Sequence, residues 1–277
     1  MYETIKYDAQ DGVGVITLDR PRVKNAICMV MRRELAHLIG ELRLDRSLRA
    51  LVVTGAGGNF CSGGDLGSLN DSARLGEASA ESRRQRLVDI SGLVSNLLQF
   101  DRPVIAAVQG VAYGAGFGIA LTADIVLAAH DARFCLSFGR LGLVPDFGVL
   151  YSLPRVVGVQ KAKELVFSCR EVRAAEAQRL GIVMETHAPD DVLARAMDIA
   201  RSFTHASALA LSLSKRALNA SPTSDLSTML MLEADGQGIS MSSDYHLAAL
   251  KRFLAKEKQL FAWPHDGSSK PASPGTV

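Results

Sequence analysis

Two glycine-rich segments, each placed just after a short apolar run, constrain this sequence more than any other feature. Nine of the 24 glycines lie within residues 55–64 and 110–118. The runs before them, residues 50–54 and 104–108, are uncharged and have the pattern of buried strands. Glycine lets the backbone approach a neighbour closely because it has no Cβ. The two segments therefore predict loops whose main chain comes close to a ligand or to another part of the chain.

The other patterns predict an α/β region followed by a helical region. Further strands are expected at residues 4–7, 13–18, 125–128 and 181–184, with a hairpin turn at Asp11–Gly12. Apolar residues at helical spacing predict three amphipathic helices, with the stripes Leu35, Leu38, Ile39 and Leu42, then Leu193, Met197 and Ala200, then Leu247, Leu250 and Leu254. The recurrence of strand, glycine loop and helix suggests stacked ββα turns.

We divide the chain into three parts. Residues 1–190 form the expected α/β core, and residues 191–262 form a helical C-terminal region. Residues 263–277 are rich in Pro, Ser and Gly, so they are expected to be a disordered tail. Within the core, residues 71–86 are polar and irregular, and their first part is expected to be mobile.

Composition argues against several classes of partner. The net charge of +2 provides no field to attract nucleic acid or a membrane surface. Residues 103–123 are uncharged, but Pro103 and four clustered glycines fit a strand, turn and short helix better than a membrane span. The four cysteines form no CxxC pair and follow no signal peptide, and the six histidines have no metal-binding spacing. A cytoplasmic protein without a metal is expected.

The glycine loops match a dinucleotide-binding motif only in part. Gly114-Ala115-Gly116 matches the start of GxGxxG, but the third glycine position holds Ile119. The loop at residues 55–58 also lacks the third small residue. A nicotinamide or flavin oxidoreductase is therefore an alternative with little support.

Taken together, the motifs resemble the crotonase family, the enoyl-CoA hydratase/isomerase superfamily. The resemblance rests on residues 18–27 (LDRPRVKNAI), residues 52–66 (VVTGAGGNFCSGGDL) and residues 102–116 (RPVIAAVQGVAYGAG), and it extends from about residue 2 to residue 261. It implies a spiral of ββα units with C-terminal helices, assembled as a homotrimer or a dimer of trimers. It also implies an acyl-CoA thioester substrate, with no cofactor other than the coenzyme A that the substrate carries.

The resemblance assigns roles to individual residues. The backbone N–H groups of Gly64 and Ala115 match the pair that holds the oxygen of a thioester enolate in the family. Coenzyme A is expected to lie along Lys24, Asn25, Ala26, Ser62, Asp65 and Leu66. Lys256 matches a basic residue that contacts the CoA phosphate, in its own or a neighbouring subunit.

The sequence departs from the hydratase pattern at its two glutamates. Their positions match Gly118 and Phe138, and no glutamate occurs between Glu81 and Glu164. Phe138 is instead expected in an apolar acyl pocket. Asp146, after Pro145, matches the base of enoyl-CoA isomerases and of the ring-oxepin-forming isomerases of phenylacetate breakdown. One carboxylate is sufficient to move a proton from C2 to C4, so an isomerase with Asp146 as its acid and base is favoured.

Several alternatives stay open from sequence. Asp146 could cap the helix that starts near Gly148. The protein could also carry out other acyl-CoA chemistry as a hydratase-like enzyme, or bind acyl-CoA without catalysis. The remaining acids of this stretch, Asp124 and Asp131, have the positions of structural residues, and Cys61 is interpreted as a packing residue.

Overall fold

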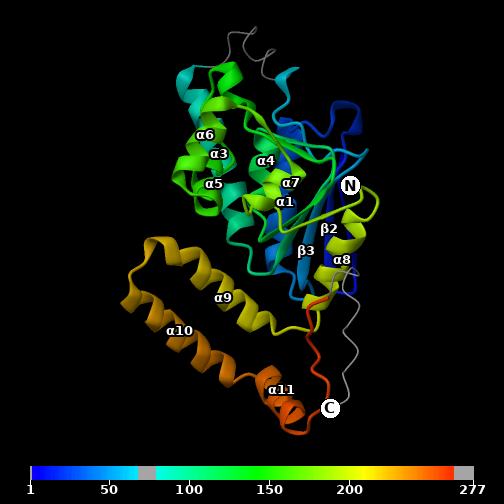
Figure 1. Cartoon of the computed structure of the whole chain (residues 1–277), viewed down its shortest axis with the longest axis vertical. Helices are drawn as coiled ribbons and strands as arrows, with labels where there is room; N and C mark the ends of the chain where they lie inside the picture. The colour runs from blue at the N-terminus through cyan, green and yellow to red at the C-terminus, as the bar shows by residue number, and fades with distance from the viewer. Residues whose placement is uncertain (1, 68–78, 265–277) are drawn as a thin grey trace.

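The computed structural model describes residues 2–67 and 79–264 (Figure 1). In this part of the chain, six strands form the larger sheet in the order β1-β2-β3-β4-β6-β9. Their bounds are β1 Ile5–Gln10, β2 Val13–Leu18, β3 Ala50–Gly55, β4 Val104–Val108, β6 Ile125–Ala129 and β9 Glu185–His187. Only the β1–β2 pair is antiparallel among them. The expected hairpin turn is confirmed, because Asp11 and Gly12 both have positive φ as such a turn requires.

A smaller sheet runs beside the first and accounts for the repeated step of the fold. It consists of β5 Val111–Tyr113, β7 Arg133–Cys135 and β8 Glu171–Arg173, in the order β5-β7-β8. The chain leaves β4 of the larger sheet, enters β5 of the smaller one and then forms a helix. It repeats the passage from β6 to β7. This confirms the spiral of ββα units.

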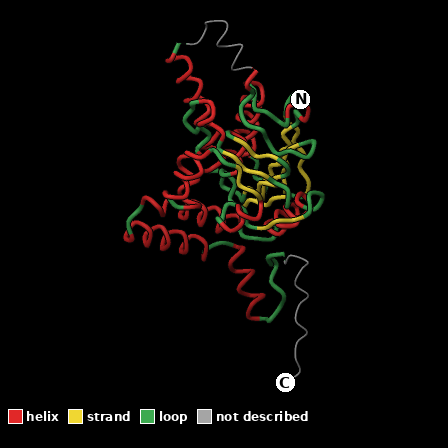
Figure 2. The backbone as a smooth tube through the Cα atoms, turned by 45° about the horizontal axis from the view of Figure 1, so that its top comes forward, coloured by secondary structure: helices red, strands yellow, loops and turns green. Residues whose placement is uncertain are grey.

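Helices surround the sheets and extend from them (Figure 2). Their bounds are α1 Met29–Leu44, α3 Ala80–Leu98, α4 Ala115–Ala120, α5 Val149–Val157, α6 Val159–Ser168, α7 Ala174–Arg179, α8 Val192–Phe203, α9 Ala208–Ala220, α10 Leu226–Met241 and α11 Asp244–Leu254, with short 3-10 turns at Pro21–Val23, Ser137–Leu141 and Ser221–Thr223. The predicted apolar stripe of α1 is confirmed, because Leu35, Leu38, Ile39 and Leu42 are all buried. None of the helices in the described ranges is long and apolar enough to cross a membrane.

Strands β3 and β4 form the centre of the core, and every residue in them is buried. Helix α8 packs against both strands. The boundary placed at residue 190 therefore separates segments that pack together, and the core includes α8. Helices α9 to α11 extend away from the sheets (Figure 1), and no residue of these three fully described helices is buried.

The structure corrects two local expectations. The strand predicted at residues 181–184 lies at residues 185–187 instead, because Ile182 and Val183 both donate their N–H to the carbonyl of Ala177 in a turn. The predicted tail begins in an ordered contact, since Trp263 packs edge-on against Phe203 with ring centroids 5.9 Å apart. Residues 265–277, like residues 71–78 of the expected mobile stretch, lie outside the described residues.

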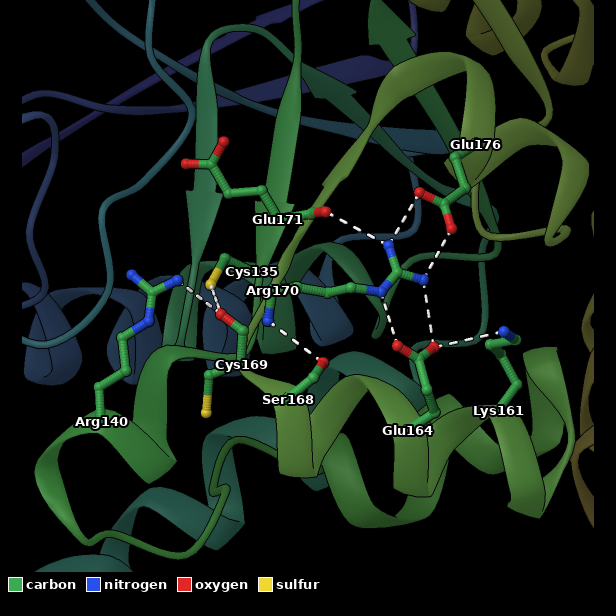
Figure 3. Close-up of polar contacts among 9 residues, drawn as sticks. All are labelled: Cys135, Arg140, Lys161, Glu164, Ser168, Cys169, Arg170, Glu171 and Glu176. Atoms are coloured by element: carbon green, nitrogen blue, oxygen red, sulfur yellow. Dashed lines mark hydrogen bonds and ion pairs between the residues drawn. The ribbon is translucent and has the colours of Figure 1, made fainter.

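One arginine joins three consecutive elements behind the smaller sheet. Arg170 precedes β8 and pairs with Glu164 of α6, at Nε–Oε1 2.6 Å, and with Glu176 of α7, at Nη2–Oε1 2.7 Å (Figure 3). Hydrogen bonds from Arg170 and Lys161 lower the pKa of Glu164 to about 2. Bidentate guanidinium–carboxylate pairs hold a defined geometry, so this cluster positions β8 between the two helices.

Candidate active site

Main-chain hydrogen bonds hold the two glycine-rich loops side by side. The N–H of Cys61 donates to the carbonyl of Val111, and the N–H of Tyr113 donates to the carbonyl of Cys61, both at 2.9 Å. A Cβ at Gly116 would lie 2.4 Å from the Cys61 carbonyl oxygen, a distance that no side chain tolerates. The close approach predicted from the glycines is therefore an approach of the loops to one another.

Two backbone N–H groups lie free at this junction, those of Gly64 and Ala115. Gly63, with φ of 101°, brings its loop against α4, because a Cβ on it would lie 3.7 Å from the nitrogen of Ala115. Ala115 is the first residue of α4, where an N–H has no partner within the helix. Among the hydrogen bonds of residues 2–67 and 79–264, none is donated by the N–H of Gly64 or of Ala115. Neither N–H group is therefore engaged by an acceptor in the described part of the chain.

Asp146 lies in a mostly apolar loop before α5. Its Oδ1 atom is buried and, within the described residues, has no hydrogen-bond partner. Burial raises the pKa of this carboxyl group, and the positive charge of Arg32 offsets only part of the rise. Its side chain does not cap α5, since Gly148 occupies the N-cap and makes no side-chain cap bond. The capping role considered from sequence is therefore wrong.

Two consecutive residues with positive φ, a conformation that most side chains disfavour, shape the loop that carries Asp146. Phe147 is buried and has a φ of 51°, and Gly148 follows with a φ of 71°. A Cβ at Gly118 of α4 would lie 2.6 Å from the Cβ of Phe147. The loop that carries Asp146 therefore touches the helix that carries Ala115, one turn from its start. A glutamate at position 118 has no room in this arrangement.

Arg32 is a site residue that the sequence did not single out. It lies on α1, and its guanidinium carbon stands 5.6 Å from the ring centroid of Phe147. A lone arginine on an amphipathic surface helix carries no signal of such a role. Its place in the site depends on how α1 packs against the loop before α5, which no local sequence pattern encodes.

The structure gives Asn25 a role different from the expected contact with coenzyme A. Its side chain is fully buried, and its Nδ2 donates to the carbonyls of Ala56 at 2.9 Å and Asn59 at 2.7 Å. Its Oδ1 accepts the N–H of Arg20 at 2.8 Å. The expectation of a direct contact is therefore wrong for this side chain. Asn25 instead supports the first glycine-rich loop from within.

The other residues expected along coenzyme A surround the same loop. Lys24 is exposed, and its carbonyl accepts the N–H of Ser62 at 2.9 Å. Asp65 pairs with Arg20 at 2.9 Å, and the same arginine donates to the carbonyl of Ala26 at 2.5 Å. Ala26 and Asp65 are thus joined through Arg20 next to Gly64.

Three further expected residues have different outcomes. The side chain of Leu66 is largely exposed beside the loop. The ring of Phe138 approaches the second loop, with its Cζ 3.7 Å from where a Cβ of Gly114 would stand. Lys256 follows α11, which lies at the opposite end of the molecule from α4 (Figure 1).

Two acidic or nucleophilic groups nearby are structural. Asp124 accepts the N–H of Val104 at 2.7 Å and pairs with Lys215 at 2.6 Å, which matches its expected structural role. Burial raises the pKa of the Cys61 thiol to about 12. Cys61 is therefore a packing residue, as expected, because only a thiolate is strongly nucleophilic. No three potential metal ligands come together in the described ranges.

The fold and the comparisons with known proteins define the class of protein. The chain belongs to the enoyl-CoA hydratase/isomerase family, whose model matches residues 8–264. It is similar to the crystal structure of an enoyl-CoA hydratase/isomerase from Cupriavidus metallidurans, with a TM-score of 0.91 and 41% identity over 96% of this chain and 99% of the other.

Curated relatives carry both kinds of name. The chain is 38% identical to a probable enoyl-CoA hydratase of Rhodobacter capsulatus, over 94% of this chain and 98% of the relative. It is 34% identical to a 1,2-epoxyphenylacetyl-CoA isomerase of Escherichia coli, over 94% and 99%. The family is thus established, and its members include proteins named for either reaction.

Proposed function

We propose that this acyl-CoA enzyme is an isomerase that moves a carbon–carbon double bond through a thioester enolate, with Asp146 as its single acid and base. The observation that carries the proposal is the state of Asp146, a largely buried carboxyl group with an Oδ1 that has no partner in the described structure and a raised pKa. Gly118 supports it, since the position of one hydratase glutamate has no space for a side chain.

The reaction follows from the geometry of the loops. The thioester oxygen would accept hydrogen bonds from the N–H groups of Gly64 and Ala115, which stabilise the negative charge that forms there. Asp146 would take a proton from C2 and return it to C4, so the double bond moves and no atom is gained or lost. A raised pKa suits this carboxyl group, because it must hold the proton between the two steps.

Coenzyme A is the only cofactor moiety that this mechanism requires, and it arrives as part of the substrate. Lys24, Ser62 and Leu66 lie beside Gly64 and are proposed to contact it. Because α11 extends away from the sheets (Figure 1), we propose that Lys256, which follows this helix, serves the site of a neighbouring copy in a trimer or hexamer.

The deciding experiment compares Asp146→Asn with the wild type on 3-enoyl-CoA substrates. The variant should bind a saturated acyl-CoA as the wild type does and lose turnover by about a hundredfold or more. Asp131→Asn changes an exposed acid in a turn and serves as the matched control. Unchanged turnover in Asp146→Asn would remove this residue from the mechanism.

Two further measurements separate the alternatives. Exchange of the C2 proton of a bound acyl-CoA in deuterated water distinguishes an enzyme from a non-catalytic binder. Addition of water to crotonyl-CoA should stay near background, because no second acid is placed at position 118 or 138. Rapid hydration would contradict the assignment as an isomerase.

A further inference from the structure

A cavity of about 1290 Å³ extends from Asp146 toward the C-terminal end of α1. Its walls come from four helices, α1, α3, α5 and α9. Ligand pockets in proteins are commonly about 300–1,000 Å³, so this cavity has room for far more than the reacting carbons of a short acyl chain. What the cavity holds depends on the chemistry of its walls.

Two walls of the cavity differ in polarity. Apolar and aromatic side chains line it from α3, from the loop before α5 and from α5, namely Leu87, Val94, Leu98, Phe147 and Tyr151. Helix α9 instead presents a polar stripe at helical spacing, made of Ser212, Lys215, Arg216 and Asn219, and Thr223 of the following 3-10 turn continues it. Lys215 of this wall is already paired with Asp124, so Arg216 is its charged group without an ion pair among the described residues.

Two arginines line the cavity. They are Arg43, near the end of α1, and Arg216 of α9, and both are exposed. Arg43 donates to Oδ1 of Asn96 at 2.5 Å, a neutral partner. Among the ion pairs of the described residues, neither arginine takes part in one. Asp101, which also lines the cavity, is already paired with Arg102 at 2.7 Å.

The length of α1 between Arg32 and Arg43 gives the distance between the Asp146 end and the far end of the cavity. Arg32 marks the catalytic end, because its charge acts on Asp146 and it stacks on Phe147. Arg43 lies eleven residues further along α1, on the same face, and so about 16 Å away along the helix axis. With carbon–carbon bonds of about 1.5 Å in a zigzag chain, this corresponds to on the order of a dozen bonds.

We propose that this cavity binds a long acyl group that ends in a carboxylate, held at its far end by Arg43 and Arg216. The inference deepens the proposed function and rests on it, because the reacting end of the thioester is placed at Asp146. The apolar wall would cover the middle of the chain, and the two arginines would pair with the terminal anion. The site thereby selects acyl-CoA thioesters that carry a second, anionic terminus.

Gly40 offers a direct probe of this path. It lines the cavity between the two ends, and a Cβ built on it meets no atom within 4 Å. A side chain at this position would lean toward the N-terminus of α1, the direction of Arg32. A leucine at position 40 would therefore narrow the cavity without disturbing the packing of α1.

The test uses calorimetric binding of unreactive, saturated thioesters. Dodecanoyl-CoA is compared with its ω-carboxy counterpart, and butyryl-CoA serves as the short ligand. Wild-type protein should bind the ω-carboxy thioester about threefold or more tightly than dodecanoyl-CoA, a size that fits partly exposed ion pairs. The double variant Arg43→Gln/Arg216→Gln should lose this preference, and Arg33→Gln, which changes an α1 arginine that does not line the cavity, should keep it.

Gly40→Leu tests the path independently of charge. It should weaken both long thioesters about tenfold and leave butyryl-CoA unchanged. Equal affinity for the two long thioesters in the wild type, or a preference that survives in the double variant, would overturn the proposal. So would a Gly40→Leu effect that is the same for short and long ligands. These ligands undergo no reaction, so failure of the isomerase assignment would appear in turnover of Asp146→Asn and not in these affinities.

Discussion

Gly118 and Phe147 touch so closely that a Cβ at position 118 would lie 2.6 Å from the Cβ of Phe147 and 3.0 Å from its carbonyl oxygen. Ordinary contacts between carbon atoms are about 3.5–4.0 Å. The contact joins α4, which begins with the amide of Ala115, to the loop that carries Asp146. In this chain, the space that a hydratase glutamate would need is occupied by the loop that supplies the single carboxylate.

The first prediction concerns this contact. Gly118→Ala should destabilise the protein by about 1–3 kcal/mol, because the added methyl group forces Phe147 and Asp146 to shift. Turnover should fall with it. Gly40→Ala is the matched control, since that glycine also lies in a helix but has open space around it, and it should stabilise the protein by up to about 1 kcal/mol. Urea unfolding measures the change in stability, and an activity assay measures the change in turnover. A Gly118→Ala protein with unchanged stability would show that the close contact with Phe147 does not require glycine at this position.

The second prediction concerns the pH dependence of Asp146. The carboxyl group must be ionised to accept the C2 proton, and burial raises its pKa above the ordinary value of 3.8. The acid limb of kcat/KM should therefore lie above pH 3.8. Arg32→Gln removes a charge that favours the ionised form, so this limb should move to higher pH. A limb that stays in place in Arg32→Gln would show that this charge does not act on the base.

Stability provides an independent check on the same group. A folded-state pKa that is raised favours the fold at low pH, and this contribution is lost as the pH rises through that pKa. Asp146→Asn should therefore melt above the wild type at neutral pH, on the order of 2 °C. The difference should shrink as the pH falls toward 3.8. A variant that melts below the wild type at neutral pH would contradict the inferred cost of burying this carboxylate.

The third prediction separates support of the loop from contact with coenzyme A. Asn25→Ala leaves the carbonyls of Ala56 and Asn59 without their donor, so it should cost about 2–4 kcal/mol of stability. Lys24→Gln, at the exposed neighbouring position, should change stability little and weaken binding of butyryl-CoA. Chemical unfolding and calorimetric binding report the two effects. The assignment fails if Asn25→Ala is as stable as the wild type.

The fourth prediction concerns the Arg170 cluster. The pKa of Glu164 is lowered from its ordinary value of 4.5 to about 2. Its pairing with Arg170 therefore stabilises the fold at pH values above 4.5, and this stabilisation is lost as the pH falls toward 2. Arg170→Gln should cost about 1 kcal/mol near neutral pH, a modest figure because both side chains are partly exposed to solvent. The cost should shrink between pH 4.5 and 2 and at high salt. A cost that is constant over this pH range would assign the effect to packing and not to charge.

Local sequence patterns predicted the elements whose residues form an unbroken apolar run or a regular apolar stripe. Strands β3 and β4 were predicted at nearly their observed bounds, because each is an unbroken apolar run, and the buried stripe of α1 was predicted from its regular spacing. The strand expected at residues 181–184 was misplaced, because buried apolar residues can lie in a turn as well as in a strand. A short apolar run does not distinguish the two.

The candidate site was predicted in part for a related reason. The motifs located the loops of Gly64 and Ala115, but a motif does not indicate which way a side chain points, so Asn25 was assigned to the ligand and not to the interior. The positive φ of Phe147 depends on the tight packing of its loop against α4, which no local pattern encodes. The polar stripe of α9 resembles any solvent-facing helix surface, so its place in the cavity was not predicted.

The bonds between Cys61, Val111 and Tyr113 have a consequence for how this architecture diversifies. They join main-chain atoms, so the contact between the two glycine-rich loops depends on the backbone and is insensitive to most exchanges of side chains. The carboxylate that we propose as the acid and base lies on another segment, the loop of Asp146. That loop can therefore change while the contact between the glycine-rich loops is kept, in a family whose members are named for hydration and for isomerisation.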